Sequence, residues 1–321
     1  MKSNTMASPP QRPRVTVFGP DPLLNVTIEA RDAGAEVHFH AGGQGPWVTT
    51  MVAELGAWPV LCCMVGGETG TMLMPLLGAL PGERRVVAMS HSNGSCVFDR
   101  RDGGPRLVAA ALRAAPHRHA IDDLVAATCA AALRSELLVV CNPYPADGFP
   151  DEVYETLVAD VRAAGVPVVV DLSSPRLDRT LPHGPDLVKL NDWELAEYVR
   201  APVDGPRALL AARRLQDAGA GAVAVTRAGA PILVLPRDDE PFEVVPPRFP
   251  RGFREGCGDT MTGAIAAGLA RGLPLRDSLV LGAAAGSVNF LRHGLGTGRR
   301  AAVEELAALV TVRALGEPAA A

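Results

Sequence analysis

Short apolar runs alternate with segments of helical period along this 321-residue chain, and this alternation constrains its fold more than any other feature. Several runs are apolar at consecutive positions, as in VPVVVD, so strands made from them must be covered on both faces. Helices between such strands predict an α/β fold with a mostly parallel sheet sandwiched by helices. The predicted strands are Val15–Gly19, Pro59–Val65, Leu137–Cys141, Val166–Asp171, Leu187–Leu190, Ala222–Thr226 and Ile232–Leu235.

The segments between these strands predict helices, and together they indicate one domain over residues 14–315. Residues 113–123 are predicted as a connecting loop, and residues 1–13 and 316–321 as flexible tails. The predicted helices are Trp47–Leu55, Asp151–Ala164, Asp192–Val199, Pro206–Ala218, Thr260–Arg271 and Leu275–Arg292.

Two segments, residues 25–41 and 85–112, differ from this alternation of apolar strands and helices, because polar and apolar residues alternate in them around turns. Such a pattern is typical of hairpins with one solvated face, and RRDGG at residues 100–104 has the composition of a hairpin turn. We expect both segments to form a small β lid inserted in the main domain. An exposed strand edge in such a lid makes a homodimer through the lid a candidate assembly.

Composition excludes several classes of protein. Apolar residues make up 48% and charged residues 21%, as in an average globular chain. The net charge of −4 gives no electrostatic footprint for nucleic acid, and no run is long enough to predict a membrane helix. The six cysteines form no C-x-x-C pair, so we expect reduced thiols and a cytoplasmic location. Apart from Lys2, Lys189 is the one lysine in the sequence.

The segment EGCGDTMTG, residues 255–263, stands directly before a predicted helix. Gly256 and Gly258 flank the small residue Cys257, which leaves backbone N–H groups free to face an anion, with Asp259 at the helix start. The same residues also suit a simple loop in which Asp259 caps the helix. The segment alone does not decide between a site and a cap.

Two further elements could bring chemistry to strand ends. Gly42 and Gly43 open a turn, GGQGPW, that is either a tight strand-to-helix connection or a close backbone approach to a ligand. In KLNDWE, Asn191 and Glu194 lie three residues apart at a predicted helix start. They could form an ordinary capping box, or reach a metal–phosphate group through water.

The order of GGQG, then KLNDWE, then GCGDT resembles the ribokinase/PfkB carbohydrate kinase superfamily, and most of all its 1-phosphofructokinase and tagatose-6-phosphate kinase branch. The stretches VGGETGTML and GPDLVKLNDWEL carry the same likeness. The resemblance implies a ribokinase-like fold and ATP-dependent phosphorylation of a hydroxyl on a small sugar-like acceptor. Asp259 would be the catalytic base, and Gly256, Cys257 and Gly258 would supply the anion hole.

The resemblance also implies a place for ATP and its metal. Lys189 would touch the ATP phosphates, while Asn191 and Glu194 would hold Mg²⁺ through water, with K⁺ as a further candidate cation. The nucleotide cleft would be lined by Thr226, Gly229, Ala283, Gly286 and Asn289.

The acceptor side departs from the family pattern. Relatives with GGKGIN hold a substrate phosphate with the lysine, where this chain has Gln44, and they have asparagine at Trp47. Asn25 replaces a substrate-binding aspartate, and His91 replaces an arginine that also meets the phosphate. The candidate acceptor-binding residues are Asp21, Asn25, Gly42, Gly43, Gln44, Trp47, His91 and Asn142.

Loss of the lysine and the arginine removes the charge-assisted bonds that would hold a phosphate dianion. The leading hypothesis is therefore a kinase for a sugar, cyclitol, nucleoside or specialised metabolite that lacks the usual sugar-phosphate recognition. A sugar-phosphate kinase that uses other arginines is the alternative enzyme. A non-catalytic ligand-binding protein on the same fold is the alternative from another class. Trp47 suits a sugar ring or a core position beneath the lid.

Overall fold

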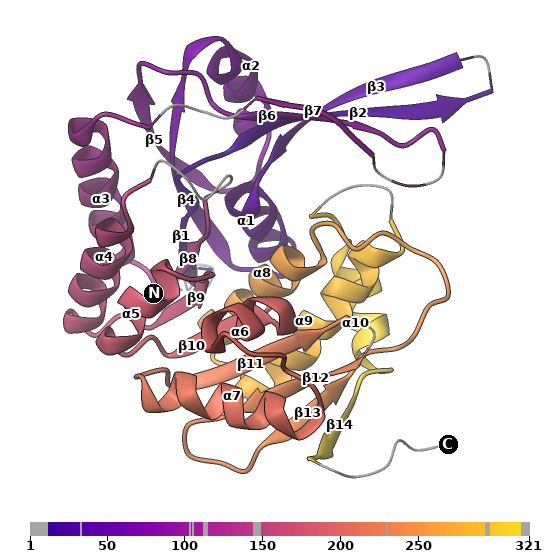
Figure 1. Cartoon of the computed structure of the whole chain (residues 1–321). Coiled ribbons are helices and arrows are strands. Elements are labelled where there is room, and N and C mark those ends of the chain that lie inside the picture. The colour runs from indigo at the N-terminus through magenta and orange to yellow at the C-terminus, as the bar shows by residue number, and fades with distance from the viewer. Residues whose placement is uncertain are drawn as a thin grey trace, which may run out of the picture.

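The structure is a computed structural model that describes residues 12–32, 34–102, 104, 106–111, 115–143, 149–228, 230–292 and 296–315. Its main feature is a ten-stranded sheet in the order β14-β13-β12-β11-β10-β9-β8-β1-β4-β5 (Figure 1). Within this order, each neighbouring pair from β5 across to β11 is parallel, whereas the pairs β11–β12, β12–β13 and β13–β14 are antiparallel. The predicted mostly parallel sheet is therefore confirmed. The strands are β1 Arg14–Phe18, β4 Trp58–Gly66, β5 Glu83–Met89, β8 Leu137–Cys141, β9 Val168–Asp171, β10 Leu187–Asn191, β11 Ala222–Arg227, β12 Ala230–Leu235, β13 Phe242–Val245 and β14 Thr311–Ala314.

Helices cover both faces of this sheet, as the apolar strands require. One layer consists of α1 Gln44–Glu54, α2 Gly67–Gly78, α8 Cys257–Ala270, α9 Leu275–Phe290 and α10 Arg300–Ala307. The other consists of α3 Arg118–Ala132, α4 Asp151–Ala163, α5 Arg176–Thr180, α6 Asp192–Val199 and α7 Gly205–Asp217. No helix in the described part of the chain is long and apolar enough to cross a membrane.

Successive side chains of each central strand enter different cores. On β4, Leu61 and Cys63 belong to the core beneath α1 and α8, whereas Val60 and Cys62 belong to the core beneath α3 and α4. All four are fully buried, and both thiols are free, which confirms the buried strand predicted from AWPVLCCMV. Burial raises the pKa of the Cys62 thiol to about 12, so it remains protonated.

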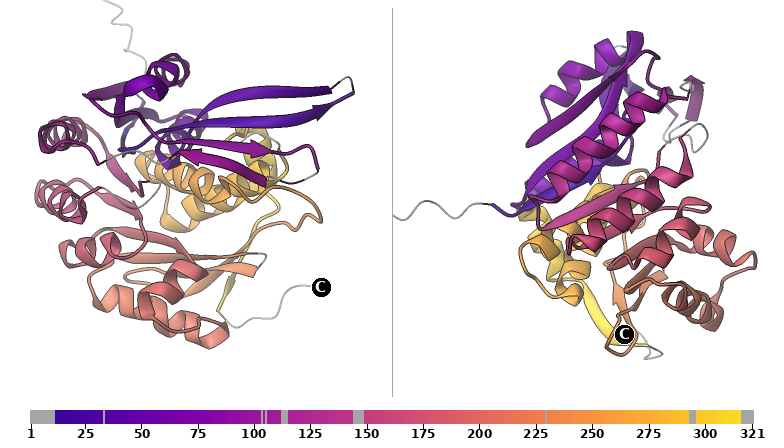
Figure 2. Two further views of the ribbon diagram at one scale, coloured as in Figure 1. Left: turned by 45° about the horizontal axis from the view of Figure 1, so that its top comes forward. Right: turned by 90° about the vertical axis from the view of Figure 1, so that its left-hand side faces the viewer.

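A second, four-stranded sheet projects from the main body as the lid (Figure 2). Its order is β3-β2-β6-β7, and it is built from β2 Leu23–Arg31, β3 Gly34–Gly42, β6 Ser95–Asp99 and β7 Arg106–Ala111. The predicted first lid segment falls on β2 and β3, and a turn at Arg101 and Asp102 follows β6. The second segment is too long by one strand, because β5 pairs with β4 in the main sheet. As an edge strand, β5 has only Met89 buried, so it lacks the continuous apolar run that marks the central strands.

The predicted connecting loop at residues 113–123 is wrong over its second half, because α3 begins at Arg118. The polar start RHAIDD suggested a loop, yet Ile121, Leu124 and Thr128 follow one another at helical spacing and are buried. Residues 112–114 lie outside the described residues, as do 1–11 and 316–321, where the predicted tails mostly fall.

Candidate active site

The carboxyl ends of four neighbouring parallel strands, β8 to β11, meet the amino-terminal ends of α1, α6 and α8. Asp171 ends β9, Lys189 and Asn191 end β10, and Thr226 lies near the end of β11. In open α/β sheets this edge is where ligands bind. The topology therefore gathers residues from distant parts of the chain into one region, next to the α8 start.

The glycine loop before α8 has the geometry of a helix amino terminus facing this edge. Gly256 is the N-cap in the left-handed region, with φ of 73°, which suits glycine. The Cys257 N–H donates to the Arg254 carbonyl oxygen at 3.2 Å, so in this structure it is engaged in the loop itself. A Cβ on Gly258 would lie 2.9 Å from the Lys189 Nζ, which shows how closely the loop backbone approaches that ammonium.

Lys189 forms a buried ion pair that sequence reasoning missed. Its Nζ donates to the Oδ2 of Asp171 at 3.0 Å, and the two side chains are only 6% and 3% exposed. The same oxygen accepts a 2.6 Å bond from the Thr262 hydroxyl on the first turns of α8. Burial opposes the charge on Lys189, but the nearby carboxylates outweigh it and raise the pKa of the ammonium.

Asp259 lies where several of these groups converge. Burial, and then the Asp171 charge, raise the pKa of its carboxyl to about 7, against the lowering influence of Lys189 and of a side-chain hydrogen bond from Gln44. A carboxylate with a pKa near neutrality is well matched to taking a proton at physiological pH. Of the two roles left open by the sequence, the simple cap does not fit, because the N-cap of α8 is Gly256 and Asp259 lies within the first turn of the helix.

Asn191 and Glu194 form a complete capping box at the start of α6. The Asn191 backbone N–H donates to the Glu194 carboxylate, and the Glu194 N–H donates to the Asn191 side-chain oxygen, each at 2.8 Å. Burial and the Asp171 charge raise the pKa of the Glu194 carboxyl. A nearby cation would therefore lower the free-energy cost of ionising this group. In the described part of the chain, no three His, Cys, Asp or Glu side chains form a preformed metal cluster.

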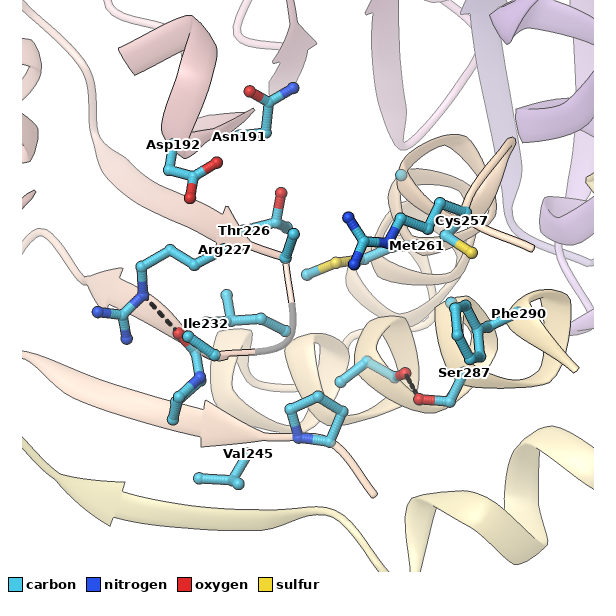
Figure 3. Close-up of a pocket in the computed structure, with 18 of the residues that line it drawn as sticks. Asn191, Asp192, Thr226, Arg227, Ile232, Val245, Cys257, Met261, Ser287 and Phe290 are labelled. Atoms are coloured by element: carbon cyan, nitrogen blue, oxygen red, sulfur yellow. Dashed lines mark hydrogen bonds between the residues drawn. The ribbon is translucent and has the colours of Figure 1, made fainter. Parts of the chain in front are cut away.

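A cavity of about 670 Å³ opens beside this loop (Figure 3). Its lining includes the polar Lys189 and Asn191, the loop residue Gly258, and the apolar Ile232, Val245 and Phe290. Thr226, Ala283 and Gly286 line it as predicted, and Gly229 lies outside the described residues. A cavity of this size with both polar and apolar lining residues fits a nucleotide.

Asn289 and Trp47 do not have the surroundings predicted for them. Asn289 does not line the cavity; its amide donates to the Glu255 carbonyl and accepts from the Thr297 N–H, so it ties two loops together. The Trp47 ring lies against the backbone of Gly296, where a Cβ would come within 2.4 Å of it. Both residues support the glycine loop, and neither contact could be read from local sequence.

The acceptor-side residues gather around the turn from β3 into α1. The Asn25 side chain packs on Gly42, and Gly43, with φ of 90°, lies next to the Asp21 backbone. The Gln44 side-chain oxygen accepts a 2.6 Å bond from the Asn142 N–H at the end of β8.

His91 lies away from these contacts. Its ring bonds to the Ser90 hydroxyl at 3.1 Å and is 5.2 Å from the His117 ring at the start of α3.

Asp171 and Thr262 are the functional candidates that the sequence did not single out. In the sequence, Asp171 is only a carboxylate at the end of an apolar strand. Its contact with Lys189, seen in the structure, is what makes it a functional candidate. The apolar cavity residues carried no signal, because they resemble core positions. Trp193 is 71% exposed at the cavity rim, next to Asn191.

Comparison with known proteins agrees with this geometry. The family model for pfkB family carbohydrate kinases matches residues 21–302. A 1-phosphofructokinase from Rhodobacter capsulatus is 30% identical over 264 residues, 80% of this chain and 82% of its own. An ATP-dependent 6-phosphofructokinase isozyme 2 from Mycobacterium tuberculosis is 30% identical over 316 residues, 92% of this chain and 91% of its own.

Solved structures show the same fold. Phosphofructokinase-2 from Escherichia coli, in complex with potassium, superposes with a TM-score of 0.80 at 24% identity, over 92% of this chain and 99% of that one. Ribokinase from Arabidopsis thaliana superposes with a TM-score of 0.71 at 19% identity, over 92% and 99%. The fold and the strand-edge site thus define a ribokinase-like phosphotransferase. The chain belongs to the pfkB family of carbohydrate kinases, which use ATP to phosphorylate sugar hydroxyls.

Proposed function

We propose that the acceptor of this kinase is an uncharged sugar-like molecule, such as a sugar, cyclitol, nucleoside or specialised metabolite. The observation that carries this proposal is the chemistry of the acceptor turn. Asp21, Asn25, Gln44 and Asn142 bring one carboxylate and three amides to it, and none of the four is a cation. A phosphate dianion next to these groups would gain no charge-assisted bond and would meet the repulsion of Asp21.

Two amide oxygens at this turn also favour hydroxyl groups. The Oδ1 atoms of Asn25 and Asn142 are buried and have no hydrogen-bond partner. A buried acceptor without a donor costs free energy, and a sugar hydroxyl supplies the missing donor, whereas an ionised phosphate offers only further acceptors.

The described residues divide the reaction between them in this proposal. Asp259 accepts the proton of the attacking hydroxyl as the bond to the γ-phosphorus forms and the bond to ADP breaks. The backbone at Gly258 and the Lys189 ammonium neutralise the charge on the transferring group. Asn191 and Glu194 would hold Mg²⁺ through water, and the bound metal would supply shielding of the phosphate charge of ATP.

The test is ADP release with Mg·ATP across paired panels of neutral acceptors and their phosphorylated counterparts. We expect turnover on neutral acceptors, and a preference for sugar phosphates would overturn the proposal. Repeating the assay in KCl and in NaCl tests K⁺ as a further cation, which the potassium complex of the Escherichia coli relative makes a natural candidate.

A sugar-phosphate kinase is the second candidate function, and the names of the relatives support it. Both curated relatives described above are phosphofructokinases, and an Escherichia coli phosphofructokinase-2 structure of 23% identity is in complex with fructose-6-phosphate. In that case the substrate phosphate would need a cationic side chain elsewhere, because positions 44 and 91 hold Gln44 and His91 in this chain. Among the described residues, Arg100 at the lid turn is a candidate for binding that phosphate. Its side chain is 4% exposed and lies 5.5 Å above the Phe253 ring. Binding without turnover on either panel would favour the non-catalytic alternative.

The substitution Glu194→Gln distinguishes two roles of this side chain, capping of helix α6 and binding of Mg²⁺. Glutamine preserves a capping box but removes the negative charge. We therefore expect an unchanged unfolding midpoint together with a Mg²⁺ requirement raised about tenfold or more, because second-layer metal contacts are typically worth that much. The measurement is a Mg²⁺ titration of kcat beside urea unfolding. A lower midpoint with an unchanged Mg²⁺ requirement would assign Glu194 to the cap alone.

A homodimer through the lid remains part of this proposal. Val37, Phe39, Leu107 and Val108 on β3 and β7 are each about half exposed, although they are large and apolar. A second copy of the lid would cover such side chains.

A further inference from the structure

The cavity beside the glycine loop has a lining that is rich in positive charge. Among the described residues that line it, four carry a cationic side chain, and a single one, Asp192, carries a carboxylate. The four cations are Lys189, Arg227, Arg248 and Arg254. ATP brings several negative charges on its phosphates, and a cation that hydrogen-bonds to the phosphate oxygens stabilises them.

Two of these cations already have carboxylate partners. The Lys189 Nζ donates to Asp171 at 3.0 Å, and both side chains are buried. The Arg227 guanidinium donates to Glu243 at 2.6 Å. Its Nε donates to the Pro231 carbonyl oxygen, also at 2.6 Å (Figure 3). The charges of Lys189 and Arg227 are therefore partly offset within the protein before any ligand binds.

The two remaining arginines have no such partner. The side chains of Arg248 and Arg254 are exposed, and within the part of the chain that the structure describes they make no hydrogen bond or ion pair. Arg254 stands two residues before Gly256, the N-cap of α8. It lines the cavity together with Cys257 and Gly258 of the glycine loop, so its charge is available where that loop faces the ligand.

The backbone at Arg254 is fixed, although its side chain has no partner. The Arg254 carbonyl oxygen accepts the Cys257 N–H at 3.2 Å. On one side, the Phe253 N–H donates to the Phe290 carbonyl oxygen at 2.8 Å. On the other side, the carbonyl oxygen of the next residue accepts from the Asn289 amide at 2.8 Å. A guanidinium carried by an anchored backbone loses less conformational freedom when it binds a ligand.

We propose that Arg254 is a nucleotide-binding residue whose guanidinium hydrogen-bonds to the phosphate oxygens of ATP. Its charge adds to that of Lys189, which Asp171 partly offsets. Arginine suits this role because its planar fork of N–H donors matches two phosphate oxygens at once. This role rests on the proposed function through the place of ATP in the cavity, and it is the same for every acceptor.

The test compares Arg254→Met with wild type and uses Arg251→Met as the matched control. Arg251 is an exposed arginine of the same loop that is not among the residues lining the cavity. The measurement is calorimetric titration with Mg·ATP and with adenosine, and neither titration needs turnover. For Arg254→Met we expect ATP affinity to fall about tenfold or more, because a hydrogen bond between charged groups is lost, while adenosine affinity stays unchanged.

Two further variants complete the comparison. Arg254→Lys should recover part of the ATP affinity, because the charge remains while the paired donors are lost. Arg251→Met should bind both ligands as wild type does. Urea unfolding midpoints of all three variants should equal that of wild type, because both arginines are exposed.

An ATP affinity of Arg254→Met equal to that of wild type would overturn the proposal and leave Arg254 a solvated surface residue. Equal losses of ATP and adenosine affinity would also overturn it, because they would assign the side chain to the shape of the loop. The acceptor proposal fails by a different measurement. A preference for sugar phosphates in the ADP-release panels would refute the uncharged acceptor and leave these titrations as expected.

Discussion

Asp259→Asn is expected to lower kcat by about 10²–10⁴-fold while leaving ATP binding in place, because it removes the base and keeps the loop backbone. The measurement is ADP release beside calorimetric titration with Mg·ATP. The matched control is Asp192→Asn, a neighbouring carboxylate at the cavity rim that the mechanism does not use. An unchanged kcat would remove Asp259 from the mechanism.

The same substitution should stabilise the fold at neutral pH. The folded pKa of Asp259 is raised to about 7 from the ordinary 3.8, so the wild-type chain loses stability as pH rises between these values. Asparagine does not titrate, and its advantage should grow by about 2 kcal/mol from pH 5.5 to pH 8. Urea unfolding at both pH values measures this difference. An advantage that is constant with pH would show that Asp259 is not desolvated.

Lys189→Met is expected to cost stability and activity together. The methionine side chain fills the space of the lysine stem, but Asp171 is left as a buried carboxylate with only the Thr262 hydroxyl as a described bond. Removing one partner of a buried pair typically costs about 3–5 kcal/mol. We expect a urea midpoint lowered accordingly and phosphoryl transfer reduced to background.

The double variant Lys189→Met/Asp171→Asn separates the two effects. Neutralising both partners removes the uncompensated charge, so stability should recover to within about 1–2 kcal/mol of wild type, whereas activity should not return. Recovery of activity together with stability would mean that Lys189 has a structural role only and does not touch the phosphates.

The sequence predicted the sheet well because its central strands are apolar at consecutive positions, which leaves few alternatives to a covered parallel sheet. It failed at the sheet edge, where β5 lacks the continuous apolar run of the central strands, and at α3, whose polar first turn resembles a loop. The GCGD and KLNDWE elements were located correctly because glycine, aspartate and asparagine at a helix start carry a local signal.

The remaining site features depend on contacts between distant segments. Asp171 acquires its role from a strand order that the sequence does not reveal, and the apolar nucleotide cavity is built from residues that resemble core. Gln44 and Trp47 were assigned to the acceptor by their place in a motif. Their contacts with Asn142 and Gly296 arise from tertiary packing alone. The acceptor identity, the lid dimer and the cytoplasmic location stay predictions.

The order of the site residues along the chain has a practical consequence. The acceptor turn is complete by Asn142, whereas the groups that serve the nucleotide begin at Asp171, and Figure 1 shows these two portions as the indigo-to-magenta and the red-to-yellow parts of the molecule. The portions join where β8 pairs with β9 and where α1 packs on α8, the latter so tightly that a Cβ on Gly263 would lie 2.7 Å from the Val48 carbonyl oxygen. A hybrid enzyme that takes its first portion from a relative should therefore inherit that relative's acceptor while retaining this chain's donor, provided that this helix pair is transplanted as a matched unit.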